Sequence, residues 1–285
     1  MTSERRWALV LVAPAVIILV GVALYPVASA MWLSLHRSIL VFHEQRFIGL
    51  GNYAFLVGDS RFWGALRNTS YFAVVAVAVE LALGLAIALL LDAATPGRGL
   101  LRASVLIPWA VPTVVSAKLW AWLYNPDYGL VTRLLPVHDV NFLGMPGWAM
   151  HAAILVDVWK TTPFVALLLL AGLQTIPRDL YRAAAVDGAS PARTFLSITL
   201  PLLRPTIVVT LVFRTLDAFR VFDAVFVLTD GGPANTTETL SIYAYKTLMR
   251  MGDFGYGSAL SVATFACVML ISLGYVRLVG VGVAR

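Results

Sequence analysis

Apolar runs of about 20 residues or more recur six times along this chain, separated by shorter, more polar segments. A helix needs about 20 apolar residues to cross the hydrocarbon core of a bilayer, so each run is long enough to span a membrane. Lipid offers the backbone no hydrogen-bond partner, and a helix satisfies its own amides. We therefore predict an all-α polytopic membrane protein. Residues 1–285 would form a single transmembrane domain with these spans: 7–35, 66–91, 103–124, 148–173, 206–229 and 257–280.

The composition excludes a soluble globular protein. Hydrophobic residues make up 60% of the chain and charged residues 13%, and the mean hydropathy is +0.83. The formal net charge of +6 would suggest nucleic acid in a soluble protein, but here most basic residues lie between the apolar runs. The single cysteine, Cys267, excludes an internal disulfide. The histidines are scattered without ligand spacing, so we expect no metal site: His36, His43, His138 and His151.

Basic residues also indicate the orientation, because they gather on the cytoplasmic side of membrane proteins. With the N-terminus inside, the short inside segments contain these arginines: Arg5, Arg6, Arg98, Arg102, Arg178, Arg182, Arg193, Arg204, Arg277 and Arg285. The longer outside segments contain fewer basic residues: Arg37, Arg46, Arg61, Arg67, Arg133, Lys246 and Arg250. The sequence therefore predicts that both termini are cytoplasmic.

The segment 174–205 is the longest polar interruption on the predicted cytoplasmic side. Pro177 suits the first turn of a helix, and the residues from Arg178 to Val186 are rich in good helix formers. Gly188 supplies a permissive backbone for the end of that helix. We therefore expect a short helix followed by a glycine turn.

A second short helix is predicted directly after this turn. Ser190 suits the N-cap and Pro191 the first helical position, and we expect the helix to run to Leu200 and to stop at Pro201 and Pro205. The physical pattern leaves two interpretations open. The two helices could lie on anionic lipid, or they could fit a cleft in a cytoplasmic partner.

Charged residues inside the predicted spans are costly and usually face a cavity or a partner. They are Glu80, Lys118, Asp157, Lys160, Arg214, Asp217, Arg220 and Asp223. The last four follow one another at i, i+3 steps with alternating sign, and neighbours at this spacing on a helix can pair. Two roles stay open for this ladder: structural pairing between helices, or contact with a solute.

Several motifs in order resemble those of one family. The polar segment resembles the EAA coupling motif of bacterial ABC importer permeases through Ala183-Ala184, Asp187-Gly188-Ala189-Ser190, Phe195 and Leu200-Pro201. The chain is similar throughout its six predicted spans to the sugar-permease branch of the maltose and trehalose type. Three further stretches carry this resemblance: Ile107-Pro108-Trp109-Ala110-Val111-Pro112, Trp159-Lys160-Thr161-Thr162-Pro163-Phe164 and Leu228-Thr229-Asp230-Gly231-Gly232-Pro233. One departure is Arg182, which stands where the family motif opens with glutamate.

The resemblance implies a fold, a function and partners. It implies the type I ABC importer permease fold, in a multi-pass protein of the bacterial cytoplasmic (inner) membrane. Such a permease is a non-catalytic transport subunit that moves a sugar, such as the disaccharides trehalose or maltose, from an extracytoplasmic binding protein or lipoprotein into the cytoplasm. It pairs with a second homologous permease and with two ATP-binding cassette subunits, which bind ATP and Mg. We expect no cofactor in this chain, which has no Gly-x-x-x-x-Gly-Lys-Ser/Thr phosphate loop.

The resemblance also implies functional residues. For contact with the ATPase it implies Arg182, Ala183, Ala184, Asp187, Gly188, Ala189, Phe195 and Pro201. For the solute pathway it implies Trp109, Thr113, Thr161, Phe164, Arg214, Ala218, Val221 and Asp223. Because Ala218 and Val221 cannot hydrogen-bond through their side chains, the neighbouring Asp217 and Arg220 are added as candidates for that role.

Two alternatives come from other functional classes. One is a membrane-embedded enzyme that acts on lipid-linked sugar with the charged fifth span as its catalytic site. The arginines beside Asp217 and Asp223 should keep these carboxylates ionised, which favours pairing over acid catalysis. The other alternative is a proton-coupled secondary transporter that uses Glu80 or Asp157.

Overall fold

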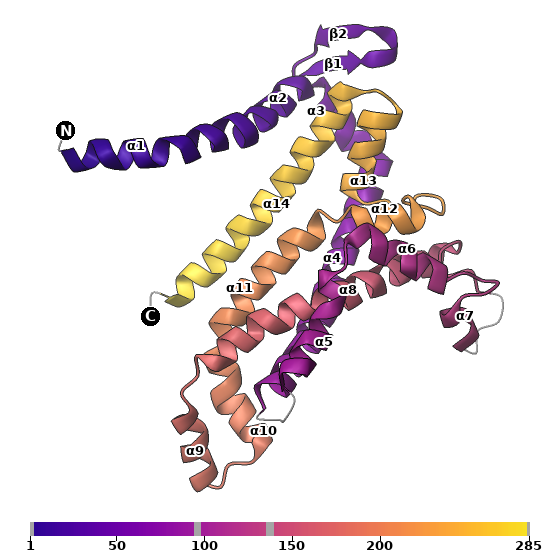
Figure 1. Cartoon of the computed structure of the whole chain (residues 1–285). Helices are drawn as coiled ribbons and strands as arrows, with labels where there is room; N and C mark the ends of the chain where they lie inside the picture. The colour runs from indigo at the N-terminus through magenta and orange to yellow at the C-terminus, as the bar shows by residue number, and fades with distance from the viewer. Residues whose placement is uncertain (1–2, 94–97, 135–139, 284–285) are drawn as a thin grey trace. The chain divides into compact units, whose positions relative to one another are not determined.

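The computed structural model describes residues 3–93, 98–134 and 140–283, and it is dominated by helices (Figure 1). The turn residues Pro96 and Gly97, His138 and Arg285 lie outside the described residues. The helices that precede residue 140 are α1 (Ser3–Ile18), η1 (Leu19–Leu24), α2 (Tyr25–Ser34), η2 (Leu40–Phe42), α3 (Gly51–Gly58), α4 (Ser60–Asp92), α5 (Arg98–Ala110), α6 (Thr113–Leu123) and α7 (Leu130–Leu134). Those that follow it are α8 (Pro146–Gln174), α9 (Arg178–Val186), α10 (Pro191–Thr194), η3 (Phe195–Thr199), α11 (Leu200–Phe219), α12 (Asp223–Thr229), α13 (Leu240–Tyr245), η4 (Lys246–Arg250) and α14 (Phe254–Val283).

The chain divides into two compact units. The first contains Met1–Trp63 and Tyr243–Cys267, and the second contains Gly64–Ile242 and Val268–Arg285. Among the described residues, five helical segments are long and apolar enough to cross a membrane, and the bent pair α5 and α6 makes a sixth if it counts as one span. The predominance of long apolar helices is as the sequence predicts.

The first unit contains a small β-hairpin that an all-α prediction missed. Strands β1 (His36–Ile39) and β2 (Glu44–Phe47) pair antiparallel, with His36 opposite Phe47. Four-residue strands are too short to give a clear alternating pattern in a sequence. Asn52 on α3 secures the start of this hairpin, because its side-chain amide donates to the carbonyl oxygens of Ser34 and His36 at 2.7 and 2.9 Å.

Asp59, between α3 and α4, joins several parts of the first unit. Its Oδ2 accepts hydrogen bonds from the hydroxyls of Tyr243 and Tyr256, each at 2.6 Å. Its Oδ1 accepts from the backbone N–H of Arg61 at 2.9 Å, so the same carboxylate also satisfies an amide in the first turn of α4. The Arg61 guanidinium in turn lies 4.5 Å from the centre of the Tyr243 ring.

Close helix packing in the second unit depends on small residues. A Cβ atom at Gly84 of α4 would lie 2.5 Å from Cγ1 of Val165 on α8, so only glycine allows this approach. Ala88, one turn further along α4, is fully buried in the same contact region. The small-residue spacing of these two positions therefore marks the α4–α8 contact.

The third predicted span, 103–124, contains Pro108 and Pro112, and prolines at both positions would be expected to break it, but the helix is broken only at Pro112. Helices α5 and α6 meet at about 90° across Val111 and Pro112. A proline disfavours helical geometry in the residue before it and has no N–H to continue the hydrogen-bond ladder. Pro108, by contrast, is accommodated inside α5.

The fifth predicted span, 206–229, differs from the structure at both ends. The preceding short helix does not stop at Pro201 or Pro205 but continues from Pro191 to Phe219 as one long helical segment. A π-helical stretch, η3, precedes Pro201, and its wider turn lets the helix continue past a residue that has no N–H. At its other end, α11 stops at Phe219, and α12 begins only at Asp223.

Candidate functional site

A hollow of about 410 Å³ lies within the second unit, beside the break between α5 and α6 and the break between α11 and α12. It is lined by Trp109, Thr113, Asp157, Lys160, Thr161, Asp217, Ala218, Arg220, Val221, Phe222, Asp223 and Ala224. Most of the positions that the sequence assigned to a solute pathway are among them. Broken helices concentrate polar groups here, because backbone and side chains at a break can face a cavity instead of lipid.

Phe164 contributes to this site behind Trp109. The two rings are stacked, with centroids 5.9 Å apart and an angle of 18° between their planes. Trp109 therefore brings an aromatic ring to the lining of the hollow, and Phe164 packs against that ring. An aromatic face combined with nearby hydrogen-bonding groups suits a sugar, whose ring has an apolar surface and a polar rim.

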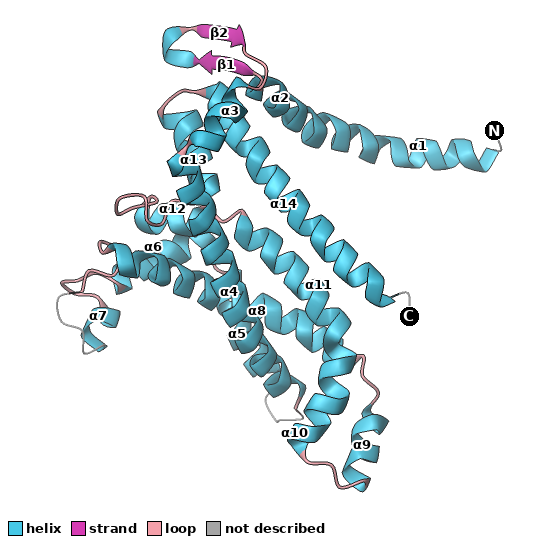
Figure 2. Ribbon diagram, turned by 180° about the vertical axis from the view of Figure 1, so that it is seen from behind, coloured by secondary structure: helices cyan, strands magenta, loops and turns pink. Residues whose placement is uncertain are grey.

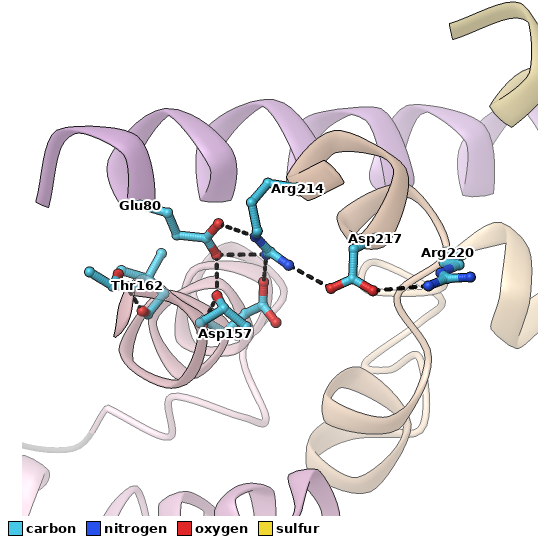
Figure 3. A network of polar contacts seen from close by, with 8 residues as sticks. Glu80, Asp157, Thr162, Arg214, Asp217 and Arg220 are labelled. Carbon is cyan, nitrogen blue, oxygen red and sulfur yellow. Dashed lines mark hydrogen bonds and ion pairs between the residues drawn. The ribbon is translucent and has the colours of Figure 1, made fainter. Parts of the chain in front are cut away.

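Arg214 does not line the hollow, and only 3% of its side chain is exposed. Figure 3 shows its guanidinium among the carboxylates of Glu80, Asp157 and Asp217. Its Nε and Nη2 donate to the two carboxylate oxygens of Glu80 at 2.7 and 2.9 Å. Nη2 also donates to Asp157 Oδ2 at 3.1 Å, and Nη1 donates to Asp217 Oδ2 at 2.6 Å. The guanidinium thus joins α4, α8 and α11, and its bond to Glu80 is bidentate, the strong geometry for this pair.

The predicted charge ladder on the fifth span is only partly present. Asp217 pairs with Arg214 and with Arg220, whose Nη2 lies 3.4 Å from Asp217 Oδ1. Asp223 is not the next step of the same helix, because α11 ends before it and Asp223 starts α12. The prediction of one continuous four-residue ladder is therefore wrong, since it assumed an unbroken helix.

The partners of Arg214 on other helices were not identified from the sequence. Glu80 and Asp157 are each a lone acidic residue in an apolar run, and such a residue needs a partner. That signal predicts that a partner exists, but not which one. Glu80 lies 134 positions from Arg214 and Asp157 lies 57 positions away, so only the packing of the helices selects the pairs.

Two further side chains have roles that the sequence did not assign. Lys160 on α8 donates to the carbonyl oxygen of Val111 at 2.6 Å and lies 3.4 Å from that of Trp109. These carbonyls lie at the end of α5, where the helix leaves them without backbone partners, so Lys160 caps the broken helix. The Thr161 hydroxyl lies 2.5 Å from Glu80 Oε1 and 2.6 Å from the Asp157 carbonyl oxygen, and its single proton can serve one of them at a time.

The predicted coupling segment adopts the expected helix and turn. Helix α9 has the predicted bounds, and Gly188 has a φ of +72°, in the left-handed region that favours glycine. Ser190 caps the next helix by accepting a hydrogen bond from the backbone N–H of Arg193, and Pro191 follows it. Both ribbon views place α9 and α10 side by side at one end of the second unit (Figure 2).

A second hollow, of about 340 Å³, lies on this coupling segment. It is lined by Leu180, Ala183, Ala184, Asp187, Ala189, Arg193, Thr194, Ser197 and Ile198. Four of the predicted ATPase-coupling residues are in this lining. Gly188 provides the turn beside it, and Phe195 and Pro201 lie further along the continuous helical segment.

Helix α9 is held against other helices of the second unit by residues other than Arg182. Arg178 donates to Asp92 at the end of α4 at 2.7 Å, and this hydrogen bond raises the pKa of Arg178. The Tyr181 hydroxyl lies 3.2 Å from Thr199 Oγ1. Arg182, by contrast, pairs only locally in the described contacts, with Asp179, and 80% of its side chain is exposed. Arg182 is therefore presented outward.

In the part of the chain that the structure describes, no group of three or more His, Cys, Asp or Glu side chains is arranged so that it could hold a metal ion. Two acidic residues of the hollow, Asp157 and Asp217, instead pair with Arg214. Their arrangement provides ion pairing and hydrogen bonding.

Comparisons with known proteins agree with this architecture. A family model described as "Binding-protein-dependent transport system inner membrane component" matches residues 80–281. The chain is 46% identical over 277 residues to the trehalose/maltose transport system permease protein MalF of Thermococcus litoralis, covering 96% of this chain and 94% of that protein. It is 45% identical over 279 residues to the trehalose transport system permease protein SugA of Mycobacterium tuberculosis, covering 98% and 90%.

A solved structure shares the fold. A chain of a bacterial ABC transporter involved in the import of the acidic polysaccharide alginate superimposes with a TM-score of 0.84 at 24% identity, covering 96% of each chain. At this identity the likeness concerns the fold alone. Together, the family model and the curated relatives show that this chain belongs to the family of binding-protein-dependent transport system inner membrane components, and that it is a non-catalytic ABC importer permease component.

Proposed function

We propose that this chain is the transmembrane permease subunit through which an ATP-driven importer moves a disaccharide of the trehalose or maltose type into the cytoplasm. The observation that carries the proposal is the hollow of the second unit, which combines the stacked face of Trp109 with hydrogen-bonding groups from α6, α8, α11 and α12. Sugars are bound by this combination of an aromatic surface and polar groups. The two curated relatives are named for trehalose or maltose transport.

The geometry of the coupling segment supports the proposal that a separate protein supplies the energy for transport. Its two helices expose a hollow that is large enough to receive side chains of another protein, and Arg178 and Tyr181 fasten the segment to membrane helices. A force applied to α9 can therefore reach α4 and α11. In the proposed assembly, two ATP-binding cassette subunits dock on the coupling segments of this chain and of a second homologous permease. ATP binding then drives alternating access, and an extracytoplasmic binding protein delivers the sugar.

The proposed orientation places both termini and the coupling segment in the cytoplasm, with six spans in the bacterial inner membrane. Cysteine labelling tests this topology, because the chain has one native cysteine. In a Cys267→Ser background, a cysteine introduced at Ser190 should react with an impermeant maleimide only in inverted vesicles, and one at Gln45 only in intact cells. Reaction of the Ser190 variant from outside would contradict the orientation.

Reconstitution tests the transport function itself. The permease pair and the ATPase subunits are placed in proteoliposomes that contain ATP, and the binding protein is added outside with radiolabelled trehalose or maltose. We expect accumulation that requires both ATP and the binding protein. Accumulation driven by a proton gradient without ATP would instead support a secondary transporter. No accumulation of either sugar would contradict the proposed substrate class.

A further inference from the structure

We propose that Arg214 is a positioning residue for transport: it holds the Asp217 carboxylate toward the hollow, and this carboxylate favours neutral polyhydroxylated solutes over anionic ones. The inference rests on the proposed function, since it assigns the specificity of the same hollow. It differs from the sequence-based expectation, in which Arg214 itself contacts the solute.

Burial and pairing exclude Arg214 as a direct ligand in this arrangement. Its side chain is 3% exposed, and it is absent from the lining of the hollow. All three guanidinium nitrogens donate to carboxylates, at distances of 2.6 to 3.1 Å. A solute could reach these donors only after displacing Asp217 or breaking a buried ion pair, which is costly.

Glu80 and Asp157 fix the position of the guanidinium. Glu80 accepts two parallel hydrogen bonds from it and is fully buried, and Asp157 accepts a third. These carboxylates come from α4 and α8, whereas Arg214 belongs to α11. The planar guanidinium is thus held by two helices other than its own. Its remaining nitrogen, Nη1, therefore has a defined direction toward Asp217.

The Asp217 carboxylate lines the hollow and is held by Arg214 from the buried side. Its side chain is 54% exposed and lines the hollow, in contrast to that of Arg214. One oxygen accepts from Arg214 at 2.6 Å, and the other lies 3.4 Å from Nη2 of Arg220, which is 72% exposed. A carboxylate has about four lone-pair sites, so Asp217 keeps acceptor capacity for solute hydroxyl groups.

The formal charges of the lining indicate the selectivity. Asp217 and Asp223 present exposed carboxylates in the lining, whereas Asp157, the third acidic residue there, is bound by the buried Arg214 guanidinium. The cations of the lining are the exposed Arg220 and the half-buried Lys160. Lys160 already donates to backbone carbonyls at the end of α5. An anionic solute would therefore meet an excess of carboxylates at short range, where interactions in a weakly polar environment are strong. A neutral sugar would meet hydrogen-bond acceptors instead.

The test uses the complete importer in proteoliposomes and compares two substrates: labelled trehalose, and labelled trehalose 6-phosphate as the anionic analogue. The quantity measured is the ratio of analogue to trehalose uptake at limiting concentrations. Because the same binding protein serves every variant, its own preference cancels when ratios are compared. We expect Asp217→Asn to raise this ratio about tenfold, and Asp217→Ala to slow trehalose uptake about tenfold, as expected for a lost hydrogen bond to a charged group.

A double-mutant cycle tests the positioning role. If Arg214 acts through Asp217, Arg214→Lys should shift the uptake ratio, and the double variant with Asp217→Asn should shift it no further than Asp217→Asn alone. If Arg214→Lys does not reach the membrane, the paired change Arg214→Gln with Glu80→Gln removes two opposite charges together and takes its place in the cycle. Glu44→Gln is the matched control, because it removes one carboxylate of an exposed pair with Arg37 in the other compact unit.

The selectivity role of Asp217 and the positioning role of Arg214 predict different results. An unchanged ratio in Asp217→Asn, with normal wild-type trehalose uptake, would overturn the selectivity role. Multiplicative effects of the Arg214 and Asp217 variants would overturn the positioning role and make Arg214 an independent ligand. A wild-type complex that transports no sugar would instead contradict the proposed function.

Discussion

Nε of Arg214 lies 2.7 Å from Oε2 of Glu80, although 134 positions separate the two residues in the chain. Both side chains are buried, and their bidentate contact connects α11 to α4. A charge in the interior is tolerated only with a well-placed partner, so the two residues depend on each other. Through Arg214, this pair links Asp217, which lines the hollow, to α4.

Breaking this pair should destabilise the protein more than breaking an exposed pair. We expect Arg214→Ala to cost about 3–5 kcal/mol, because it leaves Glu80 buried without its partner. The thermal unfolding midpoint of the purified complex measures the effect. The control is Arg37→Gln, whose pair with Glu44 is exposed and should contribute about 0–1 kcal/mol. Equal midpoints for the two variants would show that the buried contact has no special structural role.

The glycine at position 84 should be necessary for helix packing. Gly84→Ala would place a Cβ 2.5 Å from Cγ1 and 2.9 Å from Cβ of Val165, so α4 and α8 would have to separate. We expect a destabilisation of about 1–3 kcal/mol, as for other overpacked positions. Gly64→Ala is a matched control on the same helix, since a Cβ there meets nothing within 4 Å. The midpoints of both variants are compared, and a Gly84→Ala protein as stable as Gly64→Ala would refute the packing argument.

The turn at Gly188 should be needed for energy coupling but not for assembly. A Cβ at this position meets nothing within 4 Å, so the strain comes from the backbone φ of +72° alone. This backbone conformation is about 1–2 kcal/mol less favourable for a non-glycine residue, and β-branched residues are the least tolerated. We expect Gly188→Val to abolish sugar-stimulated ATPase activity and Gly188→Asn to reduce it less.

Size-exclusion chromatography of the same complexes checks assembly, which should be normal for both Gly188 variants. Gly58→Ala is the control, because that glycine has neither a left-handed backbone nor a close neighbour. Normal stimulation in Gly188→Val would show that the turn does not transmit the motion.

The hydrogen bonds that the Asp59 carboxylate accepts predict that the first compact unit loses stability in acid. Burial raises the pKa of Asp59, but hydrogen bonds from Tyr243 and Tyr256, together with two backbone amides, hold it below its ordinary value of 3.8. Because the folded pKa is below the unfolded one, the carboxylate contributes stability that is fully present above about pH 4 and is lost as the pH falls through the lowered pKa. The thermal unfolding midpoint should therefore decrease as the pH is lowered below about 4.

Two variants isolate the contribution of Asp59. Asp59→Asn should lower the midpoint at neutral pH and flatten its dependence on pH in the acid range. Tyr243→Phe removes one of the two hydroxyl donors and should give an intermediate curve. If wild type and Asp59→Asn lose stability in parallel on acidification, other carboxylates are responsible.

The sequence predicted most local features because they depend on neighbouring residues. Helix α9 has the predicted bounds, Gly188 forms the turn and Ser190 caps the next helix, since caps and turns are decided within a few residues. The continuation of the helix through Pro201 was missed, because the π-helical stretch that precedes it has no simple sequence signal.

By itself, the sequence predicted a helical membrane protein, a break near Pro112, and most of the residues that line the hollow. Apolar length, proline chemistry and residue identity are local properties, and they suffice for these conclusions. The tertiary structure decided that Arg214 lies buried behind Asp217, and that Glu80 and Asp157 are its partners. Those pairings depend on which faces of distant helices meet, and hydrophobic length alone carries no information about that choice.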